Sequence, residues 1–145
     1  MLKTLIFVSA FLVPAAGTPK ENAKKDAEVL QGKWVATAIE QRGKALPAEN
    51  VQVSMLTLVI KGDRFEFYTL TREREGKFRL DSAARPHAID LKRDPDGAEK
   101  EASLLGIYEL DRDTLRLAVD EGKRPTEFRS KGKDGALVVT FKRVK

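Results

Sequence analysis

Residues whose side chains commonly carry out chemistry are sparse in this chain. It contains a single histidine, His87, and no cysteine, so thiolate nucleophiles, thiolate metal sites and disulfides are excluded. Sequence alone places no triad partner beside His87, and no multi-histidine cluster exists for a metal. Asp94-Pro95-Asp96-Gly97 has two spaced carboxylates, but its Pro and Gly are typical of a turn. We therefore predict no catalytic residue, no metal ligand and no cofactor, and expect a protein that is not an enzyme.

The length of the chain and its content of charged residues indicate one domain with a well-solvated surface. The 145 residues are enough for one domain but too few for two ordinary ones. Charged residues make up 34% of the chain, and the net charge is +5. Basic and acidic residues are interspersed, as in Arg72-Glu73-Arg74-Glu75, rather than gathered in a basic stripe. We therefore expect no nucleic-acid partner.

Residues 1–17 have the three parts of a secretory signal peptide. Lys3 supplies a positive charge, Leu5 to Val13 form a short apolar run, and Pro14-Ala15-Ala16-Gly17 offers small residues for cleavage. The run is shorter than the roughly 20 residues of a membrane-spanning helix, although an anchor that stays attached is the alternative. We expect an exported bacterial protein, periplasmic or extracellular, with no stable membrane insertion after signal cleavage.

The segment that follows leads into the folded domain. Residues 18–28 are polar and contain Pro19, so we interpret them as a linker with a short helical turn near Asp26 to Leu30. Residues 29–145 are predicted to form a single domain.

From Gly32 onward, apolar and polar residues alternate with a period of two, and Gly, Pro and Asp clusters separate the segments. This pattern predicts strands near 33–40, 54–61, 64–71, 75–81, 87–93, 103–110, 114–120, 125–130 and 136–144. No segment offers a crossover helix, so antiparallel pairing is expected. Such a meander folds as a sandwich or closes into a barrel, and we expect an all-β, up-and-down barrel of about eight or nine strands.

In two predicted hairpins, the sequence indicates which residues pair across the strands. A two-residue turn at Gly62-Asp63 pairs Ile60 with Phe65 and Leu58 with Phe67, which places apolar side chains on one face. A turn at Arg112-Asp113 likewise has a self-consistent register. It pairs Leu110 with Leu115, Tyr108 with Leu117, and Glu109 with Arg116 on the opposite face.

The same alternation predicts which side chains point into the barrel. The inward set is Trp34, Leu56, Leu58, Ile60, Phe65, Phe67, Phe78, Leu80, Ile89, Leu91, Tyr108, Leu110, Leu115, Leu117, Phe128, Val139 and Phe141. Within this set the candidate ligand-binding residues are Phe65, Phe67, Tyr108, Leu117 and Phe128. A barrel of eight strands is just wide enough either to fill with side chains or to hold one small ligand, and both alternatives stay open at this point.

Ordered motifs resemble a known family. Leu30-Gln31-Gly32-Lys33-Trp34 contains the Gly-x-Trp element of lipocalins, in which the Trp closes one barrel end beneath a basic side chain of the last strand. Trp34, with Arg143 or Lys142, could play that part. The chain is more similar to an uncharacterised lipocalin-like domain family abundant in planctomycete bacteria, over residues 29–144. The matching motifs are Gly43-Lys44-Ala45-Leu46-Pro47, Ala88-Ile89-Asp90-Leu91, Gly106-Ile107-Tyr108-Glu109-Leu110-Asp111, Thr114-Leu115-Arg116-Leu117 and Arg124-Pro125-Thr126-Glu127-Phe128.

The resemblance implies a lipocalin-like barrel, an exported setting and, by analogy only, a ligand cavity. Arg112 departs from the family pattern, which has Gly in this turn. We expect an exported binding module that carries or senses a small hydrophobic ligand. The alternative is a non-enzymatic structural or interaction domain of the cell envelope with a filled core. A catalytic barrel would need polar groups converging inside it, and only Tyr108 and Thr69 are candidates.

Overall fold

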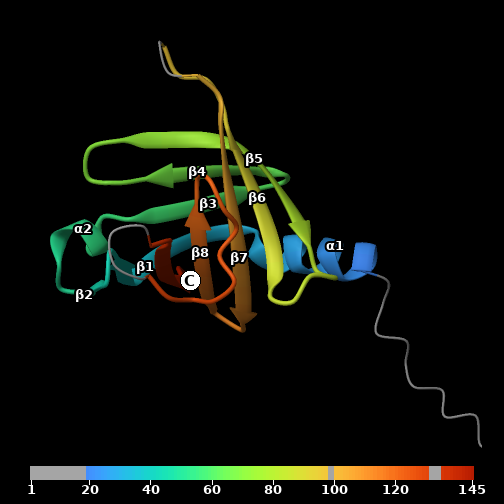
Figure 1. Cartoon of the computed structure of the whole chain (residues 1–145), viewed down its shortest axis with the longest axis horizontal. Helices are drawn as coiled ribbons and strands as arrows, with labels where there is room; N and C mark the ends of the chain where they lie inside the picture. Colours follow the sequence, from blue (N-terminus) through green and yellow to red (C-terminus); the bar gives the residue numbers. More distant parts are fainter. Residues whose placement is uncertain (1–18, 98–99, 131–134) are drawn as a thin grey trace, which may run out of the picture.

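A computed structural model describes residues 19–97, 100–130 and 135–145 of the chain (Figure 1). The predicted signal peptide lies outside the described residues. The described part contains two helices, α1 (Pro19–Leu30) and α2 (Val51–Ser54). Its strands are β1 (Gly32–Gln41), β2 (Lys44–Pro47), β3 (Thr57–Lys61), β4 (Arg64–Tyr68), β5 (Glu73–Asp81), β6 (His87–Arg93), β7 (Ala102–Asp111), β8 (Thr114–Asp120) and β9 (Leu137–Arg143).

The strands form one closed antiparallel barrel. From β3 to β9 each strand pairs with the next along the chain, and β9 returns to pair with β1, which also pairs with β3. The edge of β1 that faces away from β9 has two partners. Its first half (residues 32–35) pairs with β3, and its second half (residues 38–41) pairs with β2. The predicted all-β, up-and-down barrel is therefore confirmed, with β2 as an extra strand outside the closed ring.

Both predicted hairpin registers are confirmed. The β3–β4 hairpin pairs Ile60 with Phe65 and Leu58 with Phe67, and Gly62 has the positive φ of 61° that its tight turn requires. The β7–β8 hairpin pairs Tyr108 with Leu117. Arg112 in its turn has a φ of 56°. This left-handed backbone conformation costs energy for any residue that has a Cβ atom.

The barrel interior holds the main hydrophobic core. Sixteen of the predicted inward residues belong to this core or pack against it, and the exception is Phe128. Trp34, Tyr108 and Phe141 are its largest fully buried side chains. Successive residues along each strand therefore alternate inward and outward, and cross-strand partners share a face, as the period of two predicts.

The N-terminal segment is more ordered than we predicted. Instead of a linker with one helical turn, Pro19–Leu30 forms a continuous helix, α1. Its half-buried Ala27 and buried Leu30 face the barrel, and Pro19 suits a first helical position. Within the described residues, no helix is long and apolar enough to cross a membrane.

The predicted strand at 125–130 is wrong. This segment is irregular and lies across the outer face of β7, β8 and β9, where half-buried Phe128 packs on outward-facing Ile107, Ala118 and Val138. Phe128 is therefore outside the barrel, contrary to our prediction. Arg124 anchors the segment by donating to the carbonyl oxygen of Gly106 at 2.8 Å. These contacts bury apolar side chains that would otherwise face water.

Candidate functional site

One end of the barrel, the α1 end, is closed by Trp34, Arg143 and α1. The Arg143 guanidinium carbon lies 4.3 Å from the centroid of the Trp34 ring, as the resemblance to lipocalins implies. The same guanidinium donates to the carbonyl oxygens of Gln31, at 2.8 Å, and Val29, and the Trp34 indole donates to the Leu30 carbonyl at 2.8 Å. These donors satisfy carbonyl groups at the end of α1, which have no partner within the helix.

Tyr108 also faces this end, and its hydroxyl group forms a hydrogen bond with a residue of α1. Its hydroxyl donates to the Asp26 carboxylate at 2.7 Å, and its ring stacks on His87 with centroids 5.4 Å apart. Burial, followed by this hydrogen bond, raises the pKa of Tyr108 far above its ordinary value. The space next to it amounts to about 10 Å³, so a ligand has no room beside Tyr108.

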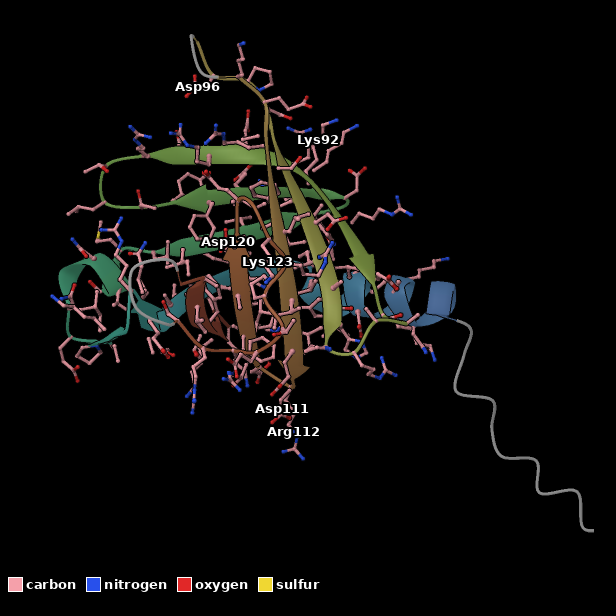
Figure 2. The ribbon with its side chains drawn as sticks, viewed as in Figure 1. Lys92, Asp96, Asp111, Arg112, Asp120 and Lys123 are labelled. Atoms are coloured by element: carbon pink, nitrogen blue, oxygen red, sulfur yellow. The ribbon has the colours of Figure 1, made fainter. Side chains whose placement is uncertain are left out.

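The opposite end, the open end, retains an apolar pocket of about 110 Å³. It lies where β6 and β8 finish and where β7 and β9 begin. Asp96, which follows β6, lies at this end of β7, whereas Asp111 and Arg112 lie at the other end (Figure 2). The apolar lining consists of Phe65, Phe67, Leu91, Ala102, Leu104, Leu117, Val119, Leu137 and Val139.

Three charged residues complete the pocket lining: Arg74, Arg93 and Glu121. Register explains the two arginines, because Arg74 pairs with inward Phe67 and Arg93 pairs with inward Gly76. Each arginine therefore occupies an inward position close to a strand end, where its stem can cover apolar surface and its guanidinium can remain near water. The Arg74 side chain is 16% exposed and its Nη1 lies 3.6 Å from Asp96 Oδ2.

Carboxylates surround the outer side of the same two arginines, in a surface hollow of about 250 Å³ beside β4 and β5. Besides Asp96, two of these carboxylates have close partners. Asp94 is paired with Arg64, and Glu66 accepts a hydrogen bond from the Tyr68 hydroxyl at 2.7 Å. That hydrogen bond is the main cause that raises the pKa of Tyr68 to about 12.

The structure brings together three of the five predicted ligand-binding residues: Phe65, Phe67 and Leu117 all line the open-end pocket. Tyr108 lies at the α1 end, and Phe128 lies outside the barrel. The sequence analysis did not single out Arg74 or Arg93. Its predicted strand began at residue 75, after Arg74, and it used the alternating charges of residues 72–75 only to show that basic residues are dispersed. Extending the alternation of inward Phe78 and Leu80 back along the strand would have placed Arg74 inward.

Comparison with family models, curated proteins and solved structures finds no match for this chain. Within the part of the chain that the structure describes, no group of three or more His, Asp or Glu side chains is arranged to hold a metal ion. The fold is thus a small antiparallel β-barrel with one end closed by α1 and an apolar pocket at the other.

Proposed function

We propose that this protein is an exported small β-barrel that binds a small hydrophobic molecule at its open end. The observation that supports this most directly is the apolar pocket of about 110 Å³ between β6, β7, β8 and β9. An apolar hollow with a few polar groups at its edge is the usual form of a small-molecule site. Export is supported by the signal-like pattern of residues 1–17.

The pocket volume limits the ligand. Sites for drug-sized molecules occupy roughly 300–1,000 Å³, so about 110 Å³ suits a short alkyl chain or a single ring. The closed floor, formed by Leu91 and Leu117, separates the pocket from the filled α1 end. The ligand therefore enters from the open end and does not reach Tyr108.

The same volume favours a second candidate function. Because most of the interior is occupied by side chains, the barrel could instead be a structural or interaction domain of the cell envelope with a filled core. In that case the pocket is a minor packing defect, and function resides on the surface.

Native mass spectrometry of protein purified from its own host distinguishes the two candidates. A co-purifying small molecule that is lost in Leu104→Phe, which fills the pocket, supports the carrier. Leu105→Phe is the matched control, because Leu105 precedes Gly106 on β7 and does not line the pocket. If every preparation shows the mass of the bare chain, and Leu104→Phe co-purifies with the same proteins as the parent, the filled-core candidate is supported.

A further inference from the structure

We propose that the ligand of the open-end pocket is a small monocarboxylic acid, whose short alkyl or single-ring tail enters the pocket and whose carboxylate meets Arg74 and Arg93. This inference rests on the proposed function and adds the chemical class of the ligand. Two guanidinium groups at the edge of an otherwise apolar hollow provide charge where a tail of limited length would place its head group.

The tail length and the position of the arginines agree with one another. The floor of the pocket is apolar, and Leu117 there is only 3% exposed. Arg74 is the second residue of β5 and Arg93 is the last residue of β6, so both lie close to a strand end. Leu91 of the floor and Arg93 of the edge are two residues apart on β6, about 7 Å along the strand, and a molecule a few carbons long spans that distance.

One contact of Arg74, with Asp96, shows that its guanidinium is positioned for a carboxylate. Asp96 Oδ2 lies 3.6 Å from Arg74 Nη1, and the Asp96 side chain is 74% exposed. An ion pair of this length at the surface contributes little to stability. A ligand carboxylate that also buries its tail can displace Asp96, and arginine offers it a two-donor fork.

Several acidic and carbonyl groups near Arg74 and Arg93 also affect the binding of an anion. Glu121 lies at the pocket edge and opposes an anion. Arg93 already donates to the Lys100 carbonyl at 3.3 Å. Among the carboxylates of the adjacent hollow, Glu73 and Glu75 occupy outward register positions beside Arg74, while Asp94 is paired with Arg64. The anion therefore gains from two guanidinium groups of the pocket lining, whereas the carboxylates other than Glu121 line the adjacent hollow and not the pocket itself.

The first experiment needs no variant. Methyl signals of the folded protein are followed by NMR during titration with hexanoate, 1-hexanol and hexylamine, which share a tail and differ in charge. We expect each compound that binds to perturb the methyl signals of Leu104 and Val139. Hexanoate should bind about tenfold more tightly than hexanol, and hexylamine should bind most weakly.

Variants then assign the preference. Arg74→Gln and Arg93→Gln together should remove the tenfold preference for hexanoate, whereas Arg79→Gln, an exposed arginine on the same strand, should keep it. Asp96→Asn should tighten hexanoate and leave hexanol unchanged, because it removes the competing carboxylate.

The outcomes separate the two proposals. Equal binding of hexanoate and hexanol, or a preference for hexylamine, overturns the acid ligand and leaves the apolar pocket standing as a binding site. If none of the three compounds perturbs the pocket methyls, both the acid ligand and the proposed function are refuted.

Discussion

Replacing Arg143 by lysine tests how the α1 end is held closed. The Arg143 side chain is 22% exposed, stacks over Trp34, and donates to the carbonyls of Val29 and Gln31 at the end of α1. Lysine keeps the charge but loses the planar fork, so it cannot stack and hold both carbonyls at once.

The expected loss follows from these contacts. A stacked cation contributes about 0.5–2 kcal/mol, and a hydrogen bond to a charged donor contributes about 1.5–3 kcal/mol. If lysine retains one of the two carbonyl contacts, Arg143→Lys should lower the free energy of unfolding by about 2–5 kcal/mol. For a domain of this size, that corresponds to a fall in Tm on the order of 10 °C.

The assay is urea unfolding followed by fluorescence of Trp34, which is the only tryptophan in the chain and is fully buried. Arg79→Lys makes the same chemical change at an exposed position of β5 and should stay within about 0.5 kcal/mol of the parent. Hydrogen exchange should show the α1 amides opening more readily in Arg143→Lys. Equal stability of the two variants would refute the role assigned to Arg143.

Three further predictions concern turns, a close approach and the tyrosines. Arg112→Gly should raise the free energy of unfolding by about 0.5–1 kcal/mol, because relief at a φ of 56° exceeds the extra chain entropy of glycine; an unchanged urea midpoint would contradict this. Gly76→Ala should lower stability by about 2–3 kcal/mol, since its Cβ would lie 1.9 Å from a backbone carbonyl oxygen of β6. Gly122→Ala, which meets open space, is the control, and similar losses in both variants would count against the steric argument. The two tyrosines, Tyr68 and Tyr108, should ionise above pH 10 in the folded protein and near pH 10 in urea, as measured by tyrosinate absorbance. Because their folded-state pKa values are raised, their stabilising contribution is complete below about pH 10 and is lost as the pH rises through about 12 for Tyr68; a native transition near pH 10 would be the contrary result.

The barrel could be predicted from sequence because one face of nearly every strand is buried. A shift of one residue would expose Leu58 or Leu117 to water, so the alternation determines the register as well as the strands. The turn at Gly62 adds a local signal that agrees with this pattern.

The errors arise where this rule of alternation does not apply. The segment containing Phe128 alternates in places, yet it packs on Ile107 and Val138 from outside the barrel. Those two outward apolar positions on β7 and β9 were the available signal that something covers this face. Helix α1 was underestimated because its stability comes from tertiary contacts, such as Tyr108 with Asp26, that local propensity does not report.

The candidate site was harder to predict than the fold. Alternation indicates which side chains point inward, but it does not say where along the barrel they leave space. Phe65 and Tyr108 are both inward and buried, yet only Phe65 lines the open-end pocket. The difference depends on the position of α1 and on side-chain volumes in three dimensions.

The contact between Arg143 and the end of α1 has a consequence for the order of folding. Arg143 and the Gln31 carbonyl that it binds are separated by 112 positions, and pairing of β9 with β1 spans a similar distance. Contacts between such remote segments form late, because a long stretch of chain must first lose its freedom. Until then β1 presents an unpaired edge to other molecules, so an incomplete or slowly folding chain would be most vulnerable to self-association at β1.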